Sequence, residues 1–600
     1  KGGENTESFK YCFLTSCILT GVHPTLTIKS TSGNPEDTIV TAENPHDHVL
    51  EVTADYVNIS GFTVKGATLG YSYYTTGIYI YEACYCNISN NIVSNNKYGI
   101  DLSYSSNNTI TNNIVLNNYY YGICLSSSTN NTITNNNASN NYDGILLHDS
   151  SNNNTITNNN VSNNYAGIEL YKSSNNNIAN NIANSNNYCG ISLYYSSNNN
   201  SIIKNTFIND GFFVWQSYQN IVKDNKVNGK PLVYLENELD VTVTDAGQVI
   251  LVNCNKITVR NLNLSNTNVG IELWKTTDSK IMNNTVLNNH YGISLVESRN
   301  NNISSNNVKS NNFYGIELYE SSNNDITSNN ALNNGFGIQL EDSSHNAIIN
   351  NNVLNNDLGI YLVKSTNNIV TKNTFINGSL SVWKSYQNIV KDNKVNGKPL
   401  VYLENKSDVT VTDAGQVILV NCNKIRVRNL SLSNTTVGVE LWKTTDSEII
   451  DNTISNEDYG IELYKSSSNT ITNNANSNNY YGGIWLYYSG NNTIVNNNAL
   501  NNLFGIFLRG SSNNTIAKNN ANSNNFYGIF SSDSSTNNKI YLNNFINNTD
   551  NVYSYNSTNI WNSTEKMTYI YNGNQYTNYL GNYWDDYKEK YPEAEEIDEC

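Results

Sequence analysis

The stretch Asn130–Ser151, NNTITNNNASNNYDGILLHDSS, decides the fold of this 600-residue chain. It holds three short apolar alternations, Thr-Ile-Thr, Asn-Ala-Ser and Gly-Ile-Leu-Leu, separated by polar residues that are mostly Asn. Alternations of three to five residues are typical of strands and are too short for helices. A unit of about 22 residues with three strands and three turns therefore predicts one coil of a parallel β-helix.

This unit repeats along most of the chain. The glycine of the motif Gly-Ile-x-Leu, or a close variant, recurs 22 or 23 residues apart from Gly99 to Gly190, from Gly292 to Gly359 and from Gly460 to Gly528. Leucine-rich repeats have a similar length, but they need a Leu-x-x-Leu-x-Leu scaffold with a helical segment, which is missing. We predict an all-β fold: a single-stranded right-handed parallel β-helix (solenoid) of about 22 coils, 22–23 residues per coil, with a C-terminal aromatic cap.

Asparagine makes up roughly a fifth of the chain and has a structural explanation. At a fixed turn position in every coil, Asn side chains stack and hydrogen-bond along the axis as a ladder. Asn also tolerates the left-handed backbone that tight turns require. Inward residues such as Ile123 and Leu125 stack about 4.8 Å from their equivalents in the next coil, which predicts a continuous apolar core.

A longer duplication overlies the short one. Phe213–Asn237 recurs with few changes as Ser381–Asn405, 168 residues later. Beyond about Asn548 the spacing is lost and Tyr and Trp crowd together, as expected of a cap that covers the last coil. The predicted regions are an N-terminal segment or atypical cap (1–24), N-terminal coils (25–204), a first block (205–372), its near-copy or second block (373–547) and the cap (548–600).

Composition excludes several classes of function. The net charge is −16, only 14 % of residues are charged, and the 34 Lys and Arg are scattered, so no basic stripe exists to follow a nucleic acid backbone. No run of 18 apolar residues is present, so we expect no transmembrane helix. Hydrophobic residues at 38 % and only six Pro argue against a disordered polar tract.

These features carry a family resemblance. The NNTITNN and GIxL coils, the segment NGKPLVYLEN…AGQVILVNC and the closing LGNYWDDY (Leu580–Tyr587) resemble NosD-like, or periplasmic copper-binding-type, repeat proteins, as found among surface proteins of methanogenic archaea. Leu26–Thr38 is similar to their opening coil. The resemblance implies a β-helix over residues 25–600 and an extracellular location. It says less about function, because the family shares its fold with carbohydrate-binding proteins and sugar hydrolases.

Two departures from the family pattern stand out. Residues 1–24 do not look like the usual N-terminal cap, and the chain reaches Cys600 before any acidic, glycine-rich stretch of the GDGIGD type. A surface anchor beyond Cys600 would fit this pattern.

Copper, which the family description suggests, needs clustered His, Met or Cys. The best pair is His46 and His48, which would share one face of a strand, although a surface turn explains them equally well. Of nine cysteines, Cys254 and Cys422 lie seven coils apart and are expected in the core, whereas Cys12 and Cys17 are a candidate disulfide. We predict no cofactor; Ca²⁺ would enter only if the chain were a lyase.

Two rows of outward side chains are the candidate functional residues. The position two after the repeat glycine carries carboxylates, and the position four after it carries aromatic rings that, beside those Glu side chains, would bind sugars along a groove. The simpler interpretation is a solvated acidic face and rings that cover the sheet. The carboxylates are Asp101, Glu169, Glu272, Glu317, Glu440 and Glu462, and the rings are Tyr171, Tyr194, Trp274, Tyr319, Trp442, Tyr464 and Tyr487.

The carboxylates are spread along the coils instead of paired at a defined gap, so we predict no catalytic residues. Were the chain an enzyme, it would be a polysaccharide lyase or glycoside hydrolase. Asn58, Asn377, Asn556 and Asn562 are candidate glycosylation sites.

The leading hypothesis is a non-enzymatic structural or adhesive β-helix rod of an archaeal cell surface. Its partners would be copies of itself, assembled into a layer, sheath or filament, or other surface proteins. The alternatives are a carbohydrate-binding or carbohydrate-processing β-helix with a polysaccharide partner, and periplasmic copper handling.

Overall fold

The computed structural model describes residues 25–69, 75–571, 573–590 and 592–593. Short strands follow one another throughout this part, and a single short helix, α1 (Tyr587–Lys590), lies near its end. The strands form about 24 turns of a right-handed parallel solenoid, which confirms the predicted fold. The chain divides into two compact units. The first comprises residues 1–301 and 308–312, and the second comprises residues 302–307 and 313–600.

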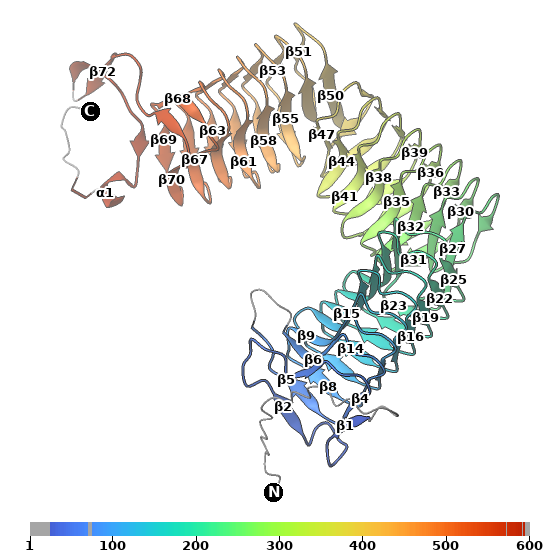
Figure 1. The fold of residues 1–600 in the computed structure, drawn as a ribbon. Coiled ribbons are helices and arrows are strands. Elements are labelled where there is room, and N and C mark those ends of the chain that lie inside the picture. Colours follow the sequence, from blue (N-terminus) through green and yellow to red (C-terminus); the bar gives the residue numbers. More distant parts are fainter. Residues whose placement is uncertain (1–24, 70–74, 572, 591, 594–600) are drawn as a thin grey trace. The chain divides into compact units, whose positions relative to one another are not determined.

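Each coil has two short strands and one long strand, as in β13 (Thr132–Thr134), β14 (Asn137–Ser139) and β15 (Asp143–His148). Each of these three strands pairs in parallel with its equivalent in the coils before and after it (Figure 1). Asn135, in the turn between the short strands, adopts a φ of 57°, the left-handed conformation that Asn tolerates better than most residues. The Asn bias of the sequence is therefore partly a requirement of the turns.

Buried Asn ladders join successive coils, as predicted. Asn136 donates through Nδ2 to the carbonyl oxygen of Ile110 in the preceding coil (2.9 Å) and to Oδ1 of Asn159 in the next coil (3.0 Å). Its own backbone N–H donates to the same Oδ1 at 2.9 Å. One side chain thus satisfies buried backbone groups in several coils, which is why a polar residue is stable in the interior.

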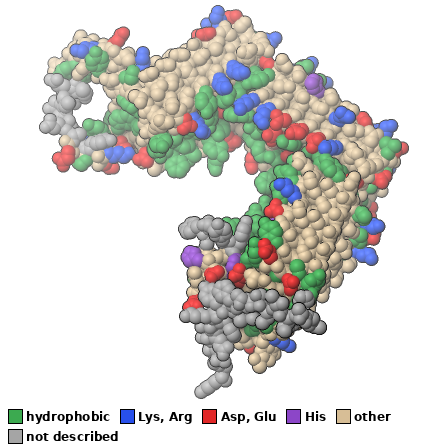
Figure 2. Space-filling model, in the orientation of Figure 1, with side chains coloured by type: hydrophobic (Ala, Val, Ile, Leu, Met, Phe, Trp, Pro, Cys, Tyr) green, Lys and Arg blue, Asp and Glu red, His purple; other side chains and the backbone are tan. Residues whose placement is uncertain are grey.

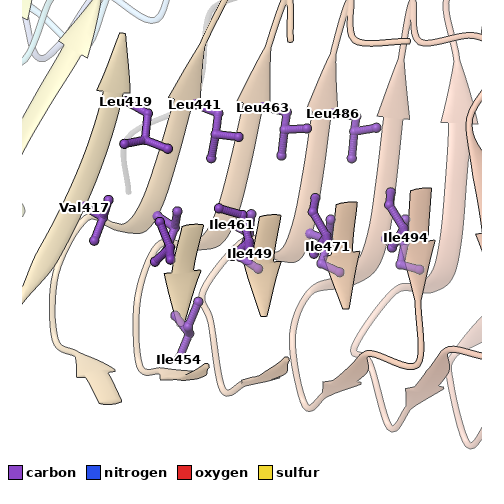
Figure 3. Close-up of a cluster of buried hydrophobic side chains, with 14 of the residues drawn as sticks. Val417, Leu419, Leu441, Ile449, Ile454, Ile461, Leu463, Ile471, Leu486 and Ile494 are labelled. Carbon is purple, nitrogen blue, oxygen red and sulfur yellow. The ribbon is translucent and has the colours of Figure 1, made fainter. Parts of the chain in front are cut away.

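Apolar columns fill the space between the sheets. Leu419, Leu441, Leu463 and Leu486 lie in one row of successive coils in the second unit and are fully buried (Figure 3). They come from the long strands β52 (Gln416–Val420), β55 (Val437–Trp442), β58 (Tyr459–Tyr464) and β61 (Gly482–Tyr487). The inward alternation predicted from the sequence is confirmed.

The Asn-Gly-Lys-Pro segment of each block changes the stacking. In the first unit, β26 (Lys226–Val227) turns back through Asn228-Gly229 into β27 (Lys230–Glu236), and this antiparallel pair begins a new stack of long strands with β29 (Gln248–Val252) and β32 (Val269–Trp274). The earlier long-strand sheet ends at β24 (Phe212–Trp215). The second unit repeats this change of sheet: the long-strand sheet ends at β47 (Leu380–Trp383), and a new one begins with β49 (Lys394–Val395) and β50 (Lys398–Glu404).

A buried Gln side chain completes the open edge of each terminating strand. Gln248 accepts a hydrogen bond from the N–H of Phe212 through Oε1 (2.9 Å) and donates through Nε2 to the carbonyl oxygen of Phe212 (2.7 Å). Gln416 does the same for Leu380, at 3.3 and 2.7 Å. The amide takes the place of a neighbouring peptide group, so no backbone group of this residue is left unpaired.

Aromatic residues cover the end of the second unit. Trp584, in β74 (Tyr583–Trp584), stacks on Phe545 with ring centroids 4.5 Å apart, and β74 pairs with β69 (Asn544–Ile546). A hairpin of β72 (Met567–Tyr571) and β73 (Asn574–Asn578) precedes it. The division of the chain into five regions stays a prediction.

Candidate functional site

The outward side chains of the long strands form the surface that the sequence marks as functional. In β18 (Ala166–Tyr171), Ile168 and Leu170 point into the core, whereas Glu169 and Tyr171 lie on the other face and are half-buried. Strand alternation therefore places the carboxylate and aromatic rows where the sequence predicts.

The carboxylates are not the solvated face expected of them. Asp101, Glu272 and Glu440 expose only 2–3 % of their surface, and that interpretation is wrong for these three. Glu169, Glu317 and Glu462 are half-buried. In a parallel stack the side chains of adjacent coils cover one another, so an outward position is not automatically a wet one.

Glu440 and Glu462 form one carboxyl pair. They occupy aligned positions in β55 and β58, and the indole N–H of Trp442 donates to Oε1 of Glu440 at 2.6 Å. Oε2 of Glu440 is buried without a hydrogen-bond partner. Burial, reinforced by the charge of Glu462, raises the pKa of Glu440, and burial raises that of Glu462 to about 7. Two buried like charges are unfavourable, so the pair retains a proton near neutral pH.

A second pair joins Glu169 to Asp143, which the sequence analysis missed. Burial, reinforced by the charge of Glu169, raises the pKa of Asp143 well above its ordinary value, and burial raises the pKa of Glu169 as well. Asp143 immediately precedes the repeat glycine, a position that holds an aromatic ring in several coils. No signal in the sequence singles it out as acidic chemistry.

The remaining carboxylates are aligned with uncharged side chains in the next coil, and Glu317 is aligned with Gln339. Asp101 is aligned with Cys124 in the next coil, and Glu272 with Ser294. In the part of the chain that the structure describes, no group of three or more His, Cys, Asp or Glu side chains is placed to hold a metal ion. The arrangement can share protons within each pair but gathers no larger acidic centre.

Of the seven predicted sugar-binding rings, three are buried and four are half-buried, namely Tyr171, Tyr194, Tyr319 and Tyr487. Trp274, Trp442 and Tyr464 are buried. Trp274 stacks on Tyr218 with centroids 4.2 Å apart, and Trp442 lies 4.1 Å from Tyr464 and 5.2 Å from Trp383. The faces that would stack on a sugar are thus covered by other rings, and covering the sheet is the better description of these three.

A second aromatic row, which the sequence analysis did not single out, lies two residues before the repeat glycine. Tyr142, Tyr165 and Tyr188 stack in successive coils, with centroids 4.7 and 5.3 Å apart and nearly parallel planes. Tyr142 and Tyr165 expose 48 % and 38 % of their surface. The 23-residue spacing of these tyrosines was the signal that could have revealed the row.

The comparisons with known proteins decide the family. The family model described as periplasmic copper-binding protein (NosD) matches residues 233–396 and 385–589, which together span more than half of the chain. The chain belongs to the NosD family. A model described as right-handed β-helix region matches residues 48–207 of this NosD-family chain. A search of curated proteins finds no match.

Several solved structures resemble the NosD-family chain weakly. The alginate lyase AlyGC of family PL6 is 12 % identical, with a TM-score of 0.31, and the match covers 89 % of this chain and 93 % of that one. A mutant of the periplasmic alginate epimerase AlgG is 14 % identical, with a TM-score of 0.24 and coverage of 56 % and 84 %. Pectate lyase Pel9A is 18 % identical, with a TM-score of 0.22 and coverage of 36 % and 69 %.

The candidate copper pair lies in the turns between β2 (Ile39–Thr41) and β3 (Leu50–Val52), so the expected placement on one face of a strand is wrong and the surface turn is the correct description. His48 stacks on Tyr79 with centroids 4.3 Å apart, and burial lowers the pKa of its imidazole. His46 is exposed and accompanies a turn in which its N–H donates to Oδ1 of Asn44. A metal role for these two residues stays a prediction.

The other predicted sites fall in varied surroundings. Cys254 and Cys422 are buried and free, whereas Cys12 and Cys17 lie outside the described residues. Of the candidate glycosylation sites, Asn377, Asn556 and Asn562 are exposed and Asn58 is half-buried. No helix in the described residues is long and apolar enough to cross a membrane.

Proposed function

We propose that this NosD-family chain is a non-catalytic structural or adhesive protein of a cell surface, archaeal as the sequence resemblance implies, and that it works by remaining folded outside the cytoplasm and associating with copies of itself. The observation that carries this proposal is the way in which the coils are tied together. Each unit is held by repeated ladders, whereas the side chains suited to chemistry are packed against one another.

The ladders continue from coil to coil. In the first unit, Asn113, Asn136, Asn159 and Asn181 are linked in order by Nδ2-to-Oδ1 hydrogen bonds of 3.0–3.1 Å. In the second unit, Asn452, Asn474, Asn497 and Asn519 are linked at 2.9–3.0 Å. Opening one coil exposes buried polar groups in its neighbours, so unfolding is expected to be slow.

The surface also favours a structural role over turnover of a charged polysaccharide. Most of the face drawn in Figure 2 has the colour of uncharged polar side chains and backbone. The carboxyl pairs Asp143–Glu169 and Glu440–Glu462 have no Lys or Arg among the groups that shift their pKa values. A lyase of related fold would be expected to combine a base with cations or calcium to stabilise the charge that develops.

Exposed isoleucines provide a surface for association. Ile208 and Ile221 in the first unit expose 42 % and 54 % of their surface, and their equivalents Ile376 and Ile389 in the second unit expose 44 % and 53 %. The duplication thus repeats an apolar feature on the outside of the solenoid. Exposed apolar side chains at repeated positions suit contacts with further copies of the chain.

Electron microscopy of the purified full chain, with and without reductant, tests the proposal. We expect ordered assemblies whose abundance rises with protein concentration, and we expect no release of sugar products from alginate, pectate or neutral polysaccharides. Monomers at every concentration would refute self-association. Turnover of any of these polymers, lost in Glu440→Gln or Glu169→Gln, would refute the non-catalytic role.

A further inference from the structure

A polar cavity of about 210 Å³ lies in the first unit where the two long-strand stacks meet. Turns that precede long strands form its walls: 185–188 and 209–211 from one stack, and 266–268, 288–290 and residue 312 from the next. The lining residues are Asn186, Tyr188, Asn209, Asp210, Asn266, Thr267, Asn268, Asn288, Asn289, His290 and Asn312.

The carboxyl group of Asp210 is fixed at one wall. Asn186 donates to its Oδ2 from both the backbone N–H (3.1 Å) and Nδ2 (2.6 Å), and the N–H of Gly211 donates to Oδ1 (3.1 Å). Asp210 thus ends an Asn ladder at the edge of the cavity. Burial raises its pKa to about 7.

The amide of Asn268 lies opposite with unused hydrogen-bonding capacity. Asn268 exposes 1 % of its surface, and its Nδ2 is buried without a hydrogen-bond partner. Its Oδ1 accepts a long hydrogen bond from Nε2 of Gln248 at 3.4 Å. A buried amide donor without a partner costs about 1–3 kcal/mol, so this side of the corner is not fully satisfied within the protein.

Tyr188 and His290 form an aromatic wall. Tyr188 stacks on Tyr165 on one side and lies 5.9 Å from the His290 ring on the other. Nε2 of His290 contacts the carbonyl oxygen of Asn187, and Nδ1 lies 3.2 Å from Nδ2 of Asn312. Burial lowers the pKa of His290, which keeps the imidazole neutral at pH 7.

The same turns touch directly in the second block. The N–H of Gly378, the equivalent of Asp210, donates to the carbonyl oxygen of Asn434 at 3.2 Å. The N–H of Thr436, the equivalent of Asn268, donates to Oγ of Ser379 at 3.0 Å. The two turns are thus close in both copies, but backbone N–H groups bond them in the second block, whereas in the first block they line the cavity.

We propose that the cavity of the first block binds one neutral sugar residue. Its lining offers hydroxyl, carboxyl and amide groups that both donate and accept hydrogen bonds, as vicinal hydroxyls require. The side chains of Asn209, Asn266 and Asn288 in this lining are exposed and are open to the hydroxyl groups of a sugar. Lys and Arg are missing from the lining, which disfavours anions, and the single carboxyl group already accepts three hydrogen bonds, which disfavours a divalent cation.

This site goes beyond the structural role and does not depend on it. A chain that never self-associates would still bind the sugar, and a chain that binds no sugar would still assemble. Binding and assembly are therefore measured separately on the same full-length protein.

The test is titration of the full chain with glucose, galactose, mannose and N-acetylglucosamine, followed by saturation-transfer NMR and calorimetry. We expect saturable binding of at least one of them, with a Kd of about 1 mM, as is reasonable for so small a ligand. Asp210→Gly and Asn268→Thr, which introduce the residues of the second block, should each weaken binding at least about tenfold.

The matched controls are Gly378→Asp and Thr436→Asn in the second block, which should change the Kd by less than about twofold because that corner is bonded directly. Circular dichroism verifies that all four variants fold. The proposal is overturned if none of the sugars binds saturably, or if variants of both blocks lose binding equally. A crystal soaked with the best sugar that shows only ordered water in the cavity overturns it too.

A trisaccharide of the best sugar identifies the source of the ligand. If the trisaccharide binds at least as tightly as the monosaccharide, the ligand is a residue of a glycan chain. If the trisaccharide does not displace the monosaccharide, the ligand is the free sugar.

Discussion

The first and second blocks are near-copies at an offset of 168 residues but differ at the corner where each changes its stacking. Both contain the Asn-Gly-Lys-Pro hairpin, and Gln248 and Gln416 complete the edge strand in the same manner. At the corner itself, His290 in the first block corresponds to Asp458 in the second, and Asn289 corresponds to Glu457. Both blocks thus keep the Asn ladders and the Gln side chain that completes the edge strand, which we call the Gln clamp. The side chains at the corner differ in charge and hydrogen bonding.

These substitutions add carboxyl groups at buried and half-buried positions of the second block. Glu457 replaces a ladder Asn, and its Oε2 accepts hydrogen bonds from both the N–H and the hydroxyl of Thr435. Burial raises the pKa of Glu457 to about 8 and that of Asp458 to about 6. Glu462, whose pKa is about 7, stands where the first block has Ser294. The second block should therefore respond to pH more strongly than the first.

Removing the shared clamp should have the largest effect, and it should be equal in the two blocks. Gln248→Leu or Gln416→Leu leaves the N–H and C=O of the edge strand unpaired, at an expected cost on the order of 3–5 kcal/mol. Hydrogen exchange of β24 and β47 measures the local loss, with the exposed Gln575→Leu as control. A large effect in only one block would show that the clamps are not equivalent.

Exchanging the ladder residues should transfer the pH response from one block to the other. Because the folded-state pKa of Glu457 lies above its unfolded value, the folded form holds a proton that the unfolded form releases. The stability from this group is full below about pH 4.5 and is lost as pH rises toward 8. Glu457→Asn should therefore stabilise the second block at pH 8 by about 2–4 kcal/mol and much less at pH 5.

The reverse change, Asn289→Glu, should introduce the same loss with rising pH in the first block. Urea-dependent hydrogen exchange at pH 5 and pH 8 measures both variants. An equal effect of Glu457→Asn at the two pH values would contradict the assignment of a raised pKa.

Replacing one ring should have a smaller effect at the corner of the second block. Tyr464 packs on Trp442 and Trp383, whereas the first block has Val296 at this position. Tyr464→Val should cost about 1–3 kcal/mol through lost ring contacts and buried area. Tryptophan fluorescence during unfolding reports it, and the exposed Tyr480→Val should be nearly neutral. If Tyr464→Val leaves the free energy of unfolding unchanged, the block repacks around the smaller side chain and the ring contacts add no stability.

Reversing one surface charge should have the smallest effect. In the first block Nζ of Lys275 lies 3.4 Å from Glu297, whose equivalent in the second block is Lys465. Glu297→Lys should cost less than about 1 kcal/mol, because both side chains are partly exposed. The shift in Tm should disappear in about 1 M NaCl, where charges are screened within about 3 Å. A loss that persists in high salt would point to the contact of Glu297 with the Trp274 indole instead.

The repeat made most of the fold predictable. Positions such as Asn136 and Ile133 recur at a spacing that only a stack of coils explains, and the ladders and core columns follow from it. The role of Gln248 was not predictable, because it bonds to Phe212, 36 residues away, across a change of stacking that no local pattern marks.

The sequence predicted which strand face carries each candidate residue, but it did not predict which side chains pack around that residue. Alternation placed Glu440 and Trp442 on the outward face, but it could not reveal that rings from a different stack cover them. Asp143 was missed because its partner Glu169 belongs to the next coil and to a different position within it. The cavity at Asp210 was missed because its walls come from turns up to about 125 residues apart.

Hydrogen exchange of the full-length chain over days at pH 7 shows whether the ladders make both units a persistent scaffold. We expect the backbone amides of ladder residues, such as Asn136 in the first unit and Asn474 in the second, to stay protected for days while turn amides exchange quickly. Exchange of the ladder amides within minutes in either unit would contradict it.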